Sequence, residues 1–317
     1  MLTRRLFVPL SRRDPGHRIS LHFFFTITLI ISISACGQAI SKPTNTPPPT
    51  IQAGTSEHTL SVGGLERTYQ LYIPPGLNQT DPAPLVFVFH GYDPETFYAV
   101  TGIQNLSGFN DTADKNGFLI VYPYGISGSW NAEKCCGAAI QNNVDDIALV
   151  RQILQELGKV YNIDSKRIYA TGLASGAMFS YRLACQMSDS FAAIAPLAGV
   201  LLTDPCQPAQ PVSILQIHGL KDNAIPYAGG VGGLATGKIE FPSVEKGIAT
   251  WVGLDGCSSS PTTEKKDLLT HTIYSSCRAG TAVELYTHDA LGNSWPSIYV
   301  FPAAQMIWDF FNAHPKQ

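Results

Sequence analysis

Residues 170–178 read ATGLASGAM, and this stretch decides the fold prediction. A strand is predicted before it, over residues 167–170, and a helix after it, over residues 178–185. A strand, a tight glycine turn and a helix are the setting of the G-x-S-x-G motif, in which the turn exposes a nucleophilic serine. Both glycines of the motif are present, but its middle position holds Ala174. The stretch therefore predicts a strand–turn–helix site whose reactive atom is missing.

The rest of the chain alternates between strand and helix patterns. Strands are predicted over residues 58–62, 68–73, 84–90, 118–122, 192–196, 212–217 and 283–286. Helices are predicted over residues 106–115, 145–161 and 303–311. Alternating elements of this kind predict an α/β fold, with a mostly parallel central sheet covered by helices on both faces. In such sheets the sites lie at the carboxyl ends of the strands.

Composition narrows the class of protein. The chain has 317 residues, of which 44% are hydrophobic and 14% charged, so a large buried core is expected and disorder is excluded. The net charge of −3 gives no reason to expect a nucleic-acid partner. Low charge with abundant glycine and proline suits a loop-rich secreted enzyme, and we expect a monomer.

The N-terminus has the layout of a bacterial export signal. Arginines precede an apolar run at residues 21–33, which is shorter than the roughly 20 residues of a membrane span. The run ends in ISAC, which looks like a lipobox and implies lipidation of Cys36. The arginine pair Arg4-Arg5 lies far from the apolar run, and it leaves twin-arginine export open. We predict a signal peptide (1–35), a lipidated Pro/Thr-rich tether (36–56) and a globular domain (57–315). This describes an exported lipoprotein held to a membrane at the cell surface or outside the cell.

Six further cysteines suit an exported chain with disulfides. The predicted pairs are Cys185–Cys206 and Cys257–Cys277, which close short loops, and the remaining Cys135–Cys136. Adjacent Cα atoms lie about 3.8 Å apart, below the usual disulfide range, so the last bridge would be strained. A zinc site is the alternative, but no second C-x-x-C or H-x₃-H spacing accompanies these cysteines.

Five separated segments resemble one family in both order and spacing. They are GFLIVYPYGISGSWNAEKCCGAA (117–139), VDDIALVRQIL (144–154), RIYATGLASGAMFSYRLAC (167–185), HGLKDNAIPYAGG (218–230) and GNSWP (292–296). Together they resemble the polyhydroxybutyrate depolymerase and feruloyl/acetylxylan esterase group of α/β-hydrolases, of the carbohydrate esterase family one type. The resemblance covers roughly residues 58–313. It implies the α/β-hydrolase fold, hydrolysis of acyl esters, and no metal or organic cofactor.

The resemblance also implies positions for a Ser-Asp-His triad. Asp222 matches the acid, in a motif like H-G-x-x-D-x-x-V-P-Y. The base belongs to a motif like G-H-x-W-P, where this chain has Asn293, and the nucleophile position holds Ala174. A methyl group cannot attack an acyl carbon, and an amide cannot accept and return a proton near neutral pH. We therefore predict an esterase-family domain that is inactive or severely impaired but still binds an ester or glycan.

Other interpretations stay open at this point. The parent could be an active serine esterase into which the two substitutions were introduced deliberately. A relocated pair, Ser175 with His288, could supply nucleophile and base. The fold could also act only as a structural or adhesive spacer.

The resemblance implies further site residues. The oxyanion donors would be the backbone N–H groups of Tyr92 and Ser175. His90, at the end of a predicted buried strand, is expected to be structural. Trp130 and Trp295 could form an aromatic platform for a sugar or phenolic ring, although burial of each would explain them equally well.

Overall fold

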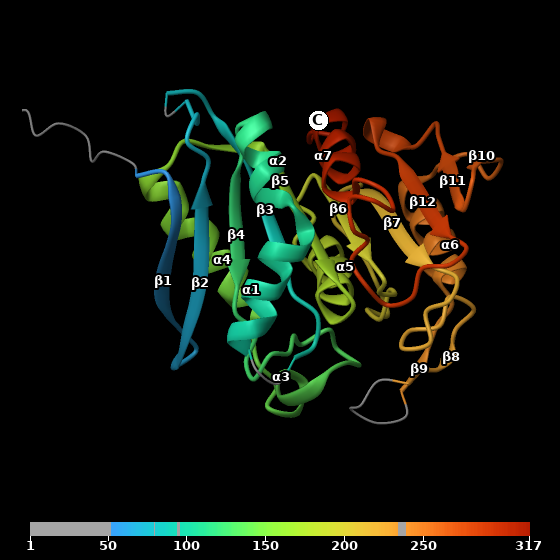
Figure 1. The fold of residues 1–317 in the computed structure, drawn as a ribbon, viewed down its shortest axis with the longest axis horizontal. Helices are drawn as coiled ribbons and strands as arrows, with labels where there is room; N and C mark the ends of the chain where they lie inside the picture. Colours follow the sequence, from blue (N-terminus) through green and yellow to red (C-terminus); the bar gives the residue numbers. More distant parts are fainter. Residues whose placement is uncertain (1–51, 79, 94–95, 234–238) are drawn as a thin grey trace, which may run out of the picture. The chain divides into compact units, whose positions relative to one another are not determined.

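The computed structural model describes residues 52–78, 80–93, 96–233 and 239–317. The predicted signal peptide, Cys36 and most of the predicted tether lie outside these residues. The described chain forms one ten-stranded sheet with helices on both faces, as Figure 1 shows, and a separate two-stranded ribbon.

The order of strands in the large sheet is β1-β2-β4-β3-β5-β6-β7-β12-β11-β10. The strands are β1 (Gly54–Val62), β2 (Leu65–Ile73), β3 (Ala83–Phe89), β4 (Leu119–Pro123), β5 (Ile163–Leu173), β6 (Ala193–Leu197), β7 (Ser213–Gly219), β8 (Gly230–Val231), β9 (Glu240–Phe241), β10 (Thr262–Lys266), β11 (Leu269–Tyr274) and β12 (Val283–His288). The helices are α1 (Thr96–Ser107), α2 (Phe109–Asn116), α3 (Gly137–Gln141), α4 (Asp146–Val160), α5 (Ser175–Gln186), α6 (Val244–Asp255) and α7 (Ala303–Ala313).

The centre of the sheet is parallel and buried. Strands β4, β3, β5, β6, β7 and β12 run parallel, while antiparallel strands flank them on both sides. Every residue of β3, β4, β6 and β7 is buried, which explains why β3, β4 and β6 are almost continuously apolar. The carboxyl ends of the parallel strands therefore lie along one edge, where sites are expected in sheets of this type.

Two hydrophobic cores fill the space between the sheet and its helices. Helices α1, α2 and α7 pack on one face and α4, α5 and α6 on the other (Figure 1). On the first face Phe118 stacks on Trp308 with ring centroids 4.1 Å apart, and on the second Phe89 meets Phe179 edge-on at 5.0 Å. The three-layer α/β architecture predicted from the sequence is thus confirmed.

The structure corrects the predicted elements in several places. The helix predicted over residues 106–115 is two helices, because Gly108 takes a left-handed φ of 70° between α1 and α2. The sheet begins at Gly54, three residues before the predicted domain boundary. Helices α3 and α6, the hairpin β10–β11 and the short strands β8 and β9 were not predicted.

A buried ion pair fixes the long loop that precedes α3. Arg67 donates to Asp146 at 2.7 Å, and the other oxygen of this carboxylate accepts from the Asn131 backbone N–H at 2.7 Å. Burial raises the pKa of Asp146 although Arg67 lowers it, so desolvation outweighs the attraction. The pair therefore specifies where the loop lies more than it adds net stability.

The structure has all three predicted disulfides. The bridge between Cys185 and Cys206 ties the end of α5 to the segment after β6, and Cys257 is bonded to Cys277. The adjacent Cys135 and Cys136 are also joined. No helix among the described residues has the length and apolar character that a bilayer crossing requires.

Candidate active site

A strained turn between β5 and α5 forms the centre of the candidate site. Ala174 follows Leu173, the last residue of β5, and has φ 51° and ψ −111°, a conformation that residues other than glycine rarely adopt. Its N–H donates to Leu197 O at 2.9 Å and its carbonyl accepts from Met178 N at 3.0 Å. Such strain persists where the surroundings enforce it, and it often marks a functional site. This is the geometry of a nucleophile elbow, with a methyl group at its apex.

The two glycines of the motif allow α5 to lie directly on β3. A Cβ atom at Gly172 would lie 2.7 Å from Phe89 O and 2.7 Å from the carbonyl carbon of Gly176. A Cβ atom at Gly176 would also collide with Phe89 O. Both positions therefore require glycine for steric reasons, which supports the register assigned from the sequence.

The loop after β3 lies against this turn. A Cβ atom at Gly91 would be 3.8 Å from the Ala174 Cβ and 3.6 Å from Leu173 O. Tyr92, the next residue, therefore lies close to the start of α5, where Ser175 is the first helical residue. Backbone N–H groups at a helix start and an adjacent loop are the usual components of an oxyanion hole.

Asp222 lies in the loop after β7 and is held by three donors. Its Oδ1 accepts from Ala224 N at 2.9 Å and from Ile225 N at 2.8 Å. Its Oδ2 accepts from Asn293 Nδ2 at 2.8 Å. With only 4% of its surface exposed, the carboxylate is fixed in one orientation, toward the residue at the predicted base position.

The buried side chain of His218 lies beside the Asp222 carboxylate. His218 Nε2 lies 2.9 Å from Ile225 O and 3.3 Å from Asp222 Oδ2, while its Nδ1 lies 3.2 Å from Gln216 Nε2. Because a carbonyl oxygen can only accept, Nε2 carries the hydrogen and Nδ1 accepts from the amide. Both ring nitrogens are thus occupied, so His218 positions the carboxylate and is not free to act as a base.

The amide of Asn293 joins the acid to the elbow. Both of its Nδ2 hydrogens have acceptors, Asp222 Oδ2 and Ala198 O, the latter at 3.1 Å. Since Ala174 N donates to Leu197 O, the neighbouring residue, Asn293 and Ala174 meet at the same end of β6. Two acceptors fix the amide orientation, and among the described residues Oδ1 has no hydrogen-bond donor. A base here would have to donate to the acid and accept from the nucleophile, and Asn293 fulfils only the first role.

The relocated pair considered from the sequence is not formed. The Ser175 hydroxyl is buried and has no hydrogen-bond partner in the described part of the chain. His288 uses Nδ1 to accept from Ala290 N at 3.2 Å and Leu291 N at 3.1 Å, and its ring lies beside Phe301. Because the hydroxyl does not contact an imidazole, the structure contradicts this alternative.

His90 is structural, as expected. Its Nε2 accepts from Gly125 N at 3.0 Å, and its Nδ1 donates to Gly91 O at 2.6 Å. Burial lowers the pKa of His90 to about 4, which the Gly91 carbonyl and the charge of Asp93 only partly oppose. The imidazole is therefore neutral at physiological pH, and it holds the loop that carries Tyr92.

Of the two roles considered for Trp130 and Trp295, the structure favours burial over a ligand platform, because both rings belong to the cores. Trp130 is fully buried, donates to His90 O at 3.0 Å and stacks on Phe179 at 5.4 Å. Trp295 is 6% exposed and meets Phe109 edge-on at 5.9 Å. Because both rings are buried against other side chains, packing alone accounts for the presence of each tryptophan in its motif. In the described part of the chain, no three His, Cys, Asp or Glu side chains are grouped to hold a metal ion.

The chain is similar in sequence to known esterases. The family model described as Esterase PHB depolymerase matches residues 67–225, half of the chain. Feruloyl esterase B of Piromyces equi is 28% identical over 247 residues, which are 75% of this chain and 43% of that protein. A bifunctional acetylxylan esterase/xylanase of Neocallimastix patriciarum is 28% identical over 249 residues, 78% of this chain and 33% of that protein. The chain therefore spans between a third and a half of the length of these two relatives.

A solved structure shows the same fold. The acetyl xylan esterase from Aspergillus awamori superposes with a TM-score of 0.55 at 17% identity, over 81% of this chain and 99% of that one. At this identity the likeness concerns the fold alone, and it confirms the predicted α/β-hydrolase architecture.

Proposed function

The chain belongs to the Esterase PHB depolymerase family, and from that premise we propose that it is an ester-binding member that does not hydrolyse esters by the family's usual route. One observation carries the proposal. The strained apex of the elbow bears a methyl group, and the partner of Asp222 is an amide with both hydrogens already bonded. Attack on an acyl carbon and proton transfer both lack an atom to perform them.

The remaining parts of the site support ligand binding. In this proposal the backbone N–H groups of Tyr92, in the loop beside Ala174, and of Ser175, at the start of α5, would donate to the carbonyl oxygen of an ester. Asn293 Oδ1 offers an acceptor for a hydroxyl of the alcohol portion. The named activities of the relatives suggest feruloyl or acetyl esters of xylan as ligands, and the family name adds hydroxyalkanoate oligomers.

Restoring the two side chains tests the proposal. We expect the unmodified chain to hydrolyse p-nitrophenyl acetate no faster than a denatured control. The double variant Ala174→Ser/Asn293→His should gain turnover by about three orders of magnitude or more, because a complete triad acts as a unit. Each single variant should stay within about tenfold of the unmodified chain, since one missing member removes most of the effect.

Three results would discriminate between the interpretations. Turnover by the unmodified chain that is well above the control would refute the silent site. Recovery in the double variant would fit an otherwise intact site, including an active parent carrying introduced substitutions. No recovery, together with calorimetric binding of acetylated or feruloylated oligosaccharides, would indicate a long-established binding role.

The sequence outside the described residues suggests where this domain works. We propose export as a lipoprotein, anchored through a lipid on Cys36 and held off the membrane by the Pro/Thr-rich tether between Cys36 and β1. An anchored ester-binding domain of this kind would meet polymeric ligands outside the cytoplasm.

A further inference from the structure

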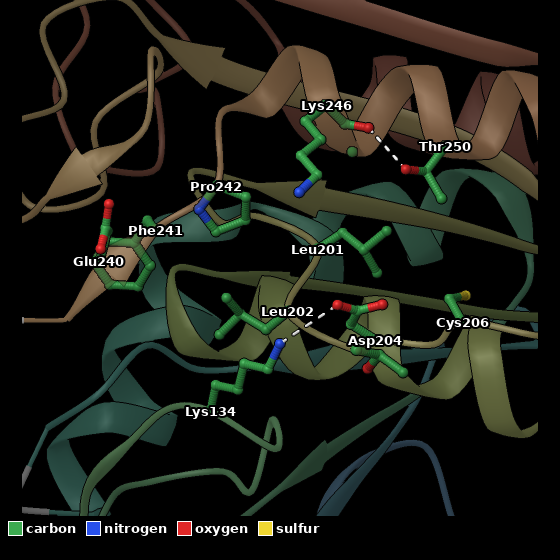
Figure 2. A pocket seen from close by; sticks show the side chains of 12 residues that line it. Lys134, Leu201, Leu202, Asp204, Cys206, Glu240, Phe241, Pro242, Lys246 and Thr250 are labelled. Carbon is green, nitrogen blue, oxygen red and sulfur yellow. Dashed lines mark hydrogen bonds and ion pairs between the residues drawn. The ribbon is translucent and has the colours of Figure 1, made fainter.

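A pocket lies close to the candidate active site, but the residues of that site do not line it. It has a volume of about 390 Å³, and neither Ala174, Asp222 nor Asn293 lines it. Its wall includes Leu201, only three residues after Ala198, whose carbonyl is bonded to the Asn293 amide. Figure 2 shows its walls, which come from the segment after β6, from β9 and from the start of α6. Its volume is in the range of pockets that hold small organic ligands.

The inner walls of the pocket are apolar and firmly held. Leu202 and Phe241 are 4% and 3% exposed, and Pro242 and Leu201 continue the apolar surface beside them. The segment that carries the two leucines ends at Cys206, which is tied to α5 by a disulfide. A preformed apolar wall of this kind favours a ring or branched hydrocarbon body over a fully hydroxylated sugar.

Charged side chains also line the pocket. Lys134 and Asp204 form an exposed ion pair at 3.8 Å on one side. Lys246 extends from the first turn of α6 toward the pocket, between Pro242 and Leu201, as Figure 2 shows. No carboxylate of the described residues lies within 4.0 Å of its amine. Among the described residues, the pocket therefore combines an apolar wall with one amine, Lys246, and one carboxylate, Glu240, that form no ion pair.

We propose that this pocket binds a small monocarboxylate with an apolar ring or branched aliphatic body. The body would lie against Leu202 and Phe241, and the carboxylate would accept from the Lys246 amine. Glu240, which lies beside Phe241 on β9 (Figure 2), would repel a second anionic group, so a monoanion fits better than a dianion. The inference does not depend on whether the candidate active site hydrolyses esters.

Isothermal calorimetry with three probes of the same shape tests this proposal. The probes are 2-naphthoate, the neutral 2-naphthamide and the cationic 2-naphthylmethylammonium. We expect 2-naphthoate to bind about five- to tenfold more tightly than the amide, as for a partly exposed ion pair. The ammonium should bind more weakly than the amide. Equal affinities for the carboxylate and the amide, or tighter binding of the ammonium, would overturn the proposal.

Variants locate the binding in this pocket. Lys246→Gln should weaken 2-naphthoate about five- to tenfold and leave 2-naphthamide unchanged. Lys266→Gln, which removes another exposed lysine from β10 at the edge of the sheet, is the matched control and should change neither. The variant Ala174→Ser/Asn293→His should bind 2-naphthoate as the unmodified chain does. If the double variant lost 2-naphthoate binding, the ligand would lie elsewhere and the proposal would be refuted. The same holds if Lys246→Gln left 2-naphthoate binding unchanged.

Discussion

Replacement of Asp255 by asparagine should stabilise the protein, and increasingly so as the pH rises. Asp255 ends α6 and is fully buried, and in the described structure neither of its carboxylate oxygens has a hydrogen-bond partner. Burial raises the pKa of Asp255 from 3.8 to about 6, and the nearby Thr281 hydroxyl, Val212 N–H and Arg278 guanidinium only partly oppose it. The folded state thus resists the ionisation that the unfolded state permits.

The sign and size of the effect follow from linkage. The pKa of this carboxyl group is higher in the folded state than in the unfolded state. Its contribution to stability is therefore smallest above pH 6, where the group is ionised in both states. Stability is therefore lost as the pH rises from about 4 to about 6, by up to ~3 kcal/mol in total. Between pH 4.5 and pH 8 the loss amounts to about 2 kcal/mol. Asp255→Asn cannot ionise, so it should escape this loss.

Urea denaturation with intact disulfides, at pH 4.5 and pH 8, measures the effect. The difference in unfolding free energy between Asp255→Asn and the unmodified chain should grow by about 2 kcal/mol from the lower to the higher pH. Asp309→Asn, which changes an exposed carboxylate on α7, is the control and should show no such growth. An advantage of Asp255→Asn that is constant with pH, or that shrinks toward pH 8, would refute the reasoning.

Two further predictions concern the elbow and the anchor. Gly172→Ala should destabilise the protein by about 3 kcal/mol in urea, because its Cβ would lie 2.7 Å from Phe89 O. Gly158→Ala on α4, where nothing lies within 4 Å, should instead be neutral or stabilise by ~0.5–1 kcal/mol; similar values for the two would contradict the steric argument. In a bacterial host the full chain should partition into the detergent phase of Triton X-114, whereas Cys36→Ser should stay in the aqueous phase; equal partitioning would exclude a lipid anchor on that cysteine.

The central sheet was predictable because burial on both faces leaves a strong pattern. The strand predicted over residues 84–90 is apolar up to Phe89, and it corresponds to β3 with a shift of one residue. The edge hairpin β10–β11 was missed because its strands are exposed or half-buried and carry charged and polar residues, so they have no such pattern. Helix α6 did carry signals, since Ser243 caps it, Val244, Ile248 and Trp251 follow at helical spacing, and Gly256 ends it.

The site was predictable in part, for a related reason. Glycines and the loop acid are fixed by backbone sterics and hydrogen bonds, and these constraints appear in the sequence as short motifs. Trp130 and Trp295 lie within the same motifs, but the sequence could not distinguish a packing role from a binding role for them. The motif spacing only reflects where the rings lie in the chain, whereas ligand access depends on the neighbours Phe179 and Phe109, which are distant in sequence.

The hydrogen bonds of Asn293 also explain why the proposed loss of chemistry need not disturb the fold. In a working triad the base donates one hydrogen to the acid, and that bond is what orients both groups. Asn293 preserves this donation to Asp222 and adds a second one to Ala198 O, so the buried carboxylate keeps a full set of partners. Leaving that carboxylate without its partner would cost about 1–3 kcal/mol or more, so an amide is among the replacements that stability tolerates. The two bonds therefore keep the acid in place, while the amide itself is not basic enough to act as the proton-transferring member of a triad.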